Sequence, residues 1–148
     1  MNKFIFILMA FIAGALLPVQ AAFNARMGKI SGSPMIAAFV SFAVGTIALL
    51  FYLIISKQQV SFANTAKEAP WYVWLAGILG CFYVASSVML LPRLGVALTF
   101  GLVIFGQLFV ALIIDHFGLF GAAIKTINVY RILGVVLLVS GVVLIRKF

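Results

Sequence analysis

Five long apolar stretches divide this chain, and they constrain its fold more than any other feature of the sequence. They cover residues 4–25, 34–56, 71–91, 94–114 and 129–145. Each is close to the roughly 20 residues that an α-helix needs to cross the hydrocarbon layer of a bilayer. The connections are short and leave no room for a separate soluble domain. We therefore expect an all-α membrane protein whose residues 1–148 form a single transmembrane domain.

The composition supports this class and argues against several others. Hydrophobic residues make up 66% of the chain and charged residues 8%, whereas a soluble domain carries about 25% charged residues. The net charge of +8 does not indicate nucleic-acid binding, because the ten basic residues stand singly at the ends of the apolar stretches. There they can extend to lipid headgroups. The single cysteine, Cys81, cannot form an internal disulfide.

The ends of the stretches carry ordinary boundary signals. Ser33-Pro34 offers an N-cap followed by proline at the first helical position. Residues 57–70 are predicted to form a polar loop, and the aromatic residues from Trp71 to Trp74 fit an interfacial belt. The first stretch resembles a secretory signal peptide. It continues to about Ala25, however, and so we expect an uncleaved spanning helix.

Basic residues are distributed evenly between the two membrane faces. One face carries Lys3, Lys57, Lys67, Lys125 and Arg131, and the other carries Arg26, Lys29, Arg93, Arg146 and Lys147. Orientation normally follows an excess of Lys and Arg in cytoplasmic loops, and here there is none. Copies inserted in both orientations are therefore expected, and they can pair antiparallel as a homodimer.

Small residues recur at helical spacing and mark faces where helices can approach closely. Ala37, Ser41 and Gly45 form one such row. In the last stretch, Gly134, Leu138 and Gly141 form a stripe that we assign to the dimer interface. Packing within one chain is the alternative for each row.

Polar residues inside the apolar stretches are few, which makes each one informative. We assign a substrate-lined cavity to Gln20, Asn24, Ser41, Tyr83, Ser87 and Gln107. Gln20 and Asn24 are four residues apart and so point from one helix face. The alternative is that these groups hydrogen-bond across packed helices, at ~0.6–2 kcal/mol each.

Two ionisable neighbours follow the fourth stretch. Asp115 and His116 are candidate gate or coupling residues, because ionisable groups at the edge of a membrane segment are often functional. The alternative for Asp115 is a salt bridge to Arg131 or Lys125. The sequence offers no metal-ligand cluster, Ser/His/Asp set or phosphate loop, and so neither an enzyme nor a cofactor or metal is expected.

Several motifs together resemble a known family. They are Gly14–Asn24, Ser33-Pro34, Ser41–Thr46, Gly77–Gly80, Pro92–Ala97, Gly106-Gln107, Asp115–Gly118 and Arg131–Gly134. This set is similar to the five-helix YdcZ-like family of the drug/metabolite transporter superfamily, described as inner-membrane exporters. The resemblance implies half of a ten-helix inverted-repeat transporter, completed by antiparallel pairing. The more distant small multidrug exporters carry a glutamate in helix one, whereas residues 4–25 here hold no acid. A neutral or zwitterionic substrate group is therefore expected.

Together these features predict a small secondary transporter of the bacterial inner membrane. It would export a small metabolite or amphipathic compound by alternating access in an antiparallel homodimer. A dual-topology channel for small anions is one alternative, and a non-transporting scaffold subunit is another.

Overall fold

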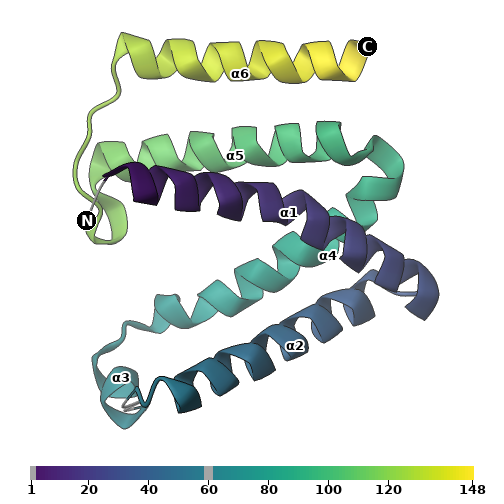
Figure 1. Cartoon of the computed structure of the whole chain (residues 1–148). Helices are drawn as coiled ribbons and strands as arrows, with labels where there is room; N and C mark the ends of the chain where they lie inside the picture. Colours follow the sequence, from purple (N-terminus) through teal and green to yellow (C-terminus); the bar gives the residue numbers. More distant parts are fainter. Residues whose placement is uncertain (1–2, 59–61) are drawn as a thin grey trace. The chain divides into compact units, whose positions relative to one another are not determined.

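The computed structural model describes residues 3–58 and 62–148, and every regular element within this part is helical (Figure 1). Five of these helical segments are long and apolar enough to cross a membrane. They are α1 (Lys3–Ser31), α2 (Pro34–Ile55), α4 (Ala76–Leu94) with the preceding 3₁₀ turn η1 (Trp71–Leu75), α5 (Val96–Phe117) and α6 (Val129–Lys147). The expectation of an all-α chain with five membrane-spanning helices is confirmed for the described residues.

Helix α1 is longer than its apolar stretch, which was expected to end near Ala25. Its 29 residues extend about 44 Å at ~1.5 Å per residue, well beyond the roughly 30 Å hydrocarbon layer. Arg26 and Lys29 lie in its last turns, and both are exposed. The helix ends only before Gly32, whose φ of 71° is left-handed. The basic residues after Ala25 thus indicate where the membrane-spanning part of this helix stops, whereas the left-handed backbone at Gly32 sets where the helix itself ends.

The connection from 57 to 70 is more structured than the loop predicted there. It contains a short helix, α3 (Phe62–Glu68). Residues 62–68 contain no glycine or proline, so the polarity of the connection does not prevent helix formation there. The break between α4 and α5 is shorter than predicted. Pro92 lies within the last turn of α4, and Gly95 alone separates the two helices, with a φ of 77°.

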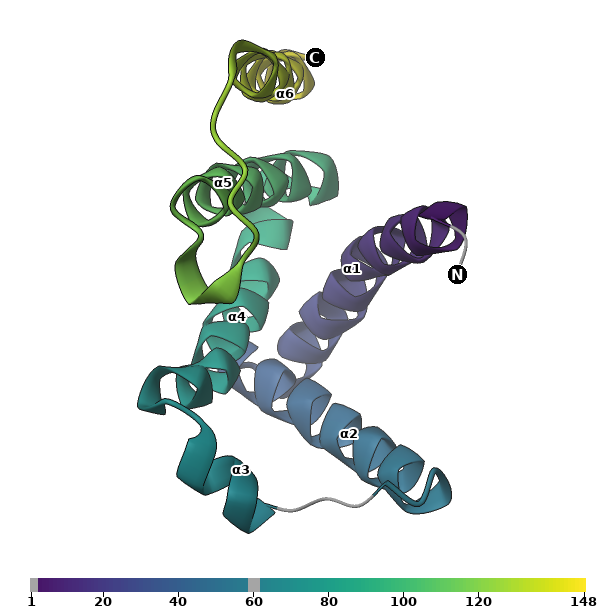
Figure 2. The ribbon, with the colours of Figure 1, turned by 90° about the vertical axis from the view of Figure 1, so that its left-hand side faces the viewer.

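The chain divides into two units at this break, one ending at Arg93 and the other running from Leu94 to Phe148. In the first unit, α1 and α2 meet near the Ser33-Pro34 turn and diverge from it (Figure 2). Ser33 caps α2 by accepting a hydrogen bond from the Ile36 N–H. A small core of Ala38, Val84 and Ala85 joins α2 to α4, and Phe42 and Tyr83 pack against it.

In the second unit, α5 packs along α6. The two helices lie close together at Gly101, where an added Cβ would be 3.1 Å from Val142 Cγ2. Gly118 ends α5 in the left-handed conformation, and the 3₁₀ turn η2 (Leu119–Gly121) follows.

Large apolar side chains cover the outer faces of all five long helices. Phe11, Phe51 and Phe82, for example, are 73%, 66% and 75% exposed. Exposure on this scale would promote aggregation of a soluble protein, but it suits helices whose outer surface meets lipid chains. The hydrophobic effect adds little to helix association within lipid, so close packing at small residues carries more of it.

Candidate functional site

A groove of about 650 Å³ lies between α1 and α2 in the first unit. It is lined by Leu16, Leu17, Val19, Gln20, Phe23, Asn24, Met27, Ala37, Val40, Ser41, Val44 and Gly45. Its size falls within the roughly 300–1,000 Å³ of typical small-molecule sites. The lining is apolar except at three positions, and none of its members is ionisable.

The three polar positions are Gln20, Asn24 and Ser41, all of them predicted cavity residues. Gln20 and Asn24 lie one turn apart on α1, and Ser41 belongs to the facing wall on α2. On that wall Ala37 has only a methyl group and Gly45 has no side chain, which leaves space between the helices. The structure thus brings together three of the six predicted residues in one groove.

Asn24 stands out among them because it is only 9% exposed. Within residues 3–58 and 62–148, its side-chain amide forms no hydrogen bond. Its unbonded polar atoms are not fully buried. Because Asn24 lines the groove, these atoms are available to a molecule bound there. A carboxamide offers two donors and one acceptor, and leaving them unpaired away from water is costly. The groove therefore presents an unused binding capacity.

Pro18 lies on α1 next to the groove residues Leu17 and Val19. Proline lacks an N–H, so the carbonyl of Gly14 loses its usual helical donor. Membrane helices tolerate such a carbonyl where neighbouring groups or water satisfy it. This part of α1 therefore has less internal hydrogen bonding than a regular helix.

The other three predicted cavity residues lie outside this groove. The Ser87 hydroxyl, 3% exposed, donates to the Tyr83 carbonyl oxygen at 2.9 Å. Tyr83 itself packs against the core between α2 and α4. Gln107 is exposed on α5, in the second unit.

Asp115 is held in a polar cluster at the end of α5. Arg131 Nη2 donates to Asp115 Oδ2 at 3.3 Å, and Arg131 Nη1 donates to the Lys125 carbonyl at 3.0 Å. The Lys125 N–H in turn donates to the Asp115 carbonyl at 2.8 Å. The salt bridge to Arg131, the alternative raised for Asp115, is therefore present. These bonds tie the connection after α5 to the start of α6.

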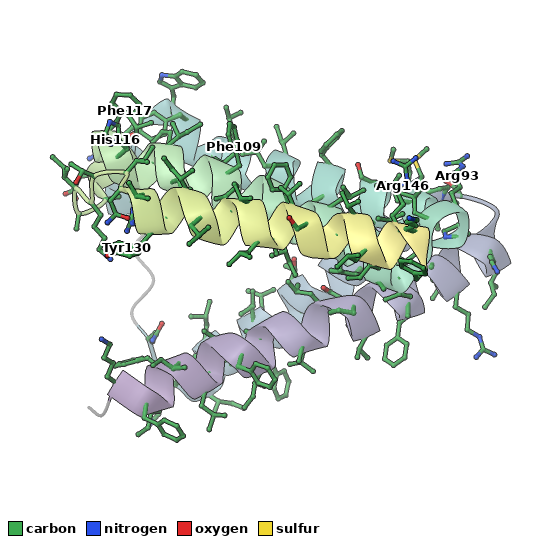
Figure 3. All side chains as sticks on the ribbon, turned by 90° about the horizontal axis from the view of Figure 1, so that it is seen from above. Arg93, Phe109, His116, Phe117, Tyr130 and Arg146 are labelled. Carbon is green, nitrogen blue, oxygen red and sulfur yellow. The ribbon has the colours of Figure 1, made fainter. Side chains whose placement is uncertain are left out.

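His116 joins the same connection through its ring. The Ile127 N–H donates to His116 Nδ1 at 3.2 Å. The imidazole ring packs edge-on against the Phe117 ring, with 4.8 Å between the ring centroids. Because Nδ1 accepts this bond, the neutral ring carries its proton on Nε2. Figure 3 shows His116 and Phe117 at one end of α5, with Arg146 at the opposite end of the unit.

The predicted dimer stripe has two different environments on α6. A Cβ added at Gly134 or Gly141 would meet no atom within 4 Å. Leu138, by contrast, is half-buried and lies one turn from Val142, which packs on α5. The described chain therefore packs nothing against the Cβ positions of the two glycines, whereas Leu138 is partly covered.

The apolar walls of the groove were not singled out in the sequence, although a signal for them exists. Leu16, Gln20, Phe23 and Met27 follow one another at spacings of three and four residues, which places them on one helix face. A second, mainly apolar cleft of about 320 Å³ lies between α5 and α6, and Arg146 is one of its lining residues. Within the described residues, no group of His, Cys, Asp and Glu is arranged to hold a metal ion.

Comparison with known proteins places these features in a wider context. Residues 5–144 match the family described as "Putative inner membrane exporter, YdcZ". The chain is 26% identical to "Inner membrane protein YdcZ" of Escherichia coli K12 over 147 residues, which cover 99% of this chain and 98% of that protein. No solved structure matches the chain.

Proposed function

The chain belongs to the YdcZ family of inner membrane exporters, and from this premise we propose that it is a small secondary transporter working by alternating access. The family match confirms the predicted resemblance and the inner-membrane location. It also supports a transporter-like role. The proposed cargo is a small metabolite or an amphipathic compound.

The observation that carries the proposal is the groove between α1 and α2. A membrane helix rarely keeps polar side chains inside its span unless they serve packing or transport. Asn24 is only 9% exposed and its side chain forms no hydrogen bond among the described residues, and Gln20 and Ser41 share its groove. A packing role would leave these groups bonded to neighbouring helices. A substrate or water explains them better.

We further propose that two copies pair antiparallel. The equal numbers of basic residues on the two faces give one copy little reason to prefer an orientation. Five spans in opposite orientations reproduce the inverted repeat that many transporters carry in one chain. The open flank of α6 at Gly134 and Gly141 is available for such a partner.

Flux from reconstituted vesicles tests the function. Vesicles holding the purified protein are loaded with a mixture of amino acids, nucleosides, sugars and small amphipathic amides and alcohols, and efflux is followed by mass spectrometry. Selective, saturable efflux that is lost in Asn24→Leu is expected. The matched control is Ser140→Leu, because Ser140 is exposed on α6 and its hydroxyl bonds only to the Val136 carbonyl of its own helix.

Two results would contradict the proposal. A steady ionic current through the same vesicles, far faster than carrier turnover, would indicate a channel. Vesicles that release no component faster than protein-free vesicles, and carry no current, would indicate a scaffold.

A further inference from the structure

We propose that the α1–α2 groove binds an uncharged amphipathic compound, whose head both donates and accepts hydrogen bonds and is anchored by Asn24. Amides, carbamates and alcohols belong to this class. The inference rests on the proposed transport function and deepens it by naming the substrate class.

The anchoring role follows from the state of the Asn24 amide. Asn24 is 9% exposed and borders the groove, and its amide forms no hydrogen bond within the described residues although its polar atoms keep accessible surface. Its NH₂ group and its carbonyl oxygen lie side by side. A head that donates to the oxygen and accepts from the NH₂ group satisfies both at once. A purely cationic head has no acceptor, and a carboxylate has no donor.

The electrostatics of the groove favour an uncharged head. None of its lining residues is ionisable. Arg26 and Lys29, the basic residues that follow on α1, lie about 160° and 140° around the helix from Asn24 at ~100° per residue, and both are exposed. An ion placed beside Asn24 would lose its hydration without gaining a counter-charge, which is strongly unfavourable.

The walls indicate an apolar body. Eight of the twelve lining residues have apolar side chains and a ninth is Gly45; only Gln20, Asn24 and Ser41 are polar. Gln20 lies one turn before Asn24, so polar contacts are confined to one part of the groove. The rest, including Phe23 and Val44, offers carbon surface to a ring or chain.

Matched probes test the substrate class by binding alone. Indole-3-acetamide, tryptamine and indole-3-acetate share an indole ring, and their heads are uncharged, cationic and anionic. Binding of each labelled compound is measured on the purified full-length protein in lipid nanodiscs. We expect the amide to bind at least about ten-fold more tightly than either ion, the scale set by pairing a buried polar group.

Substitutions at the anchor make the test specific. Asn24→Leu should weaken amide binding about ten-fold. Asn24→Asp keeps the shape of the side chain, adds an acid, and should shift the preference towards tryptamine. Gln58→Glu is the matched control, since it makes the same amide-to-acid change at an exposed position outside the groove. If Asn24→Asp fails to fold, Gln20→Glu, one turn away, provides the same test.

Three outcomes would overturn the inference. The first is equal binding of the three probes. The second is an unchanged ranking of the probes in Asn24→Asp or Gln20→Glu. The third is no binding of any probe, which would mean that lipid or a second copy fills the groove. Selective amide binding by a protein that moves nothing in the flux assay would support the inference and contradict the transport function. The two proposals therefore fail separately.

Discussion

Among the glycines of the first unit, Gly28 is the one where an added Cβ would make the shortest contact, and adding a single methyl group there tests how the unit is held together. A Cβ at this position would lie 2.8 Å from Val88 Cγ1, 3.8 Å from Ala37 Cβ and 3.8 Å from Pro34 Cα. Carbon atoms prefer separations of about 3.5–4.0 Å. The clash therefore concerns Val88 alone, and the other two contacts are ordinary.

The structure gives a magnitude for Gly28→Ala. Val88 is 4% exposed and β-branched, so its side chain has little freedom to turn away. Overpacking of this kind costs about 1–3 kcal/mol, while alanine improves helix propensity over glycine by up to about 1 kcal/mol. We expect a net loss of about 1–2 kcal/mol in the free energy of unfolding. Val88→Ala in the same chain should recover most of this loss, because it removes the clashing methyl group.

The assay is unfolding in mixed micelles with increasing dodecyl sulfate, followed by circular dichroism. The matched control is Gly14→Ala, which makes the same change in the same helix at a site with no atom within 4 Å of the added Cβ. It should leave stability unchanged or raise it slightly. Equal stability of Gly28→Ala and Gly14→Ala would refute the reasoning, as would additive effects in the Gly28 and Val88 double variant.

The polar cluster, the dimer stripe and the orientation each give a further prediction. Asp115→Asn should lower the free energy of unfolding by about 1 kcal/mol. Adding Arg131→Leu should restore part of this loss, because the unpaired charge is removed with the side chain. Normal stability together with normal pH-driven transport in Asp115→Asn would contradict both roles considered for Asp115, the salt bridge and the coupling of transport to protons. Replacing Gly134 and Gly141 by leucine should lower dimer yield in mild detergent while helix content stays constant, and unchanged dimerisation would move the interface elsewhere. A single cysteine at Ala66, in a chain otherwise free of cysteine, should react with an impermeant maleimide from both sides of native membranes. Extra lysines on one face should leave a single reactive population. Labelling of the protein without extra lysines from one side only would contradict dual orientation.

The five long helices could be predicted because the length of an apolar stretch is set by the thickness of the bilayer. Their ends could not, since a helix such as α1 continues beyond the lipid until a residue such as Gly32 turns the backbone. Composition likewise identified 57–70 as polar but did not reveal α3 within it.

The site was predictable only in part, for a related reason. Helical spacing places Gln20 and Asn24 on one face, but it does not say which neighbouring helix that face meets. Ser87 shows the limit, because its hydroxyl satisfies itself one turn back at the Tyr83 carbonyl, an outcome available to any serine in a helix. The pairing of Asp115 with Arg131 depends on how α6 returns along α5, which sequence spacing leaves open.

Because Gly28 lies near one end of α1, this helix is packed at that end and can rotate about it. Its fixed point lies where α1, α2 and α4 meet, and from Lys3 to Leu16 every residue is exposed within its own unit. From Gly28 to Lys3 the helix extends about 38 Å, so a rotation of about 5° at the junction carries the far end about 3 Å. Hinge motions of this kind need only small changes at a few residues. Such a rotation would change the width of the groove between α1 and α2 while the contacts at the packed junction change little.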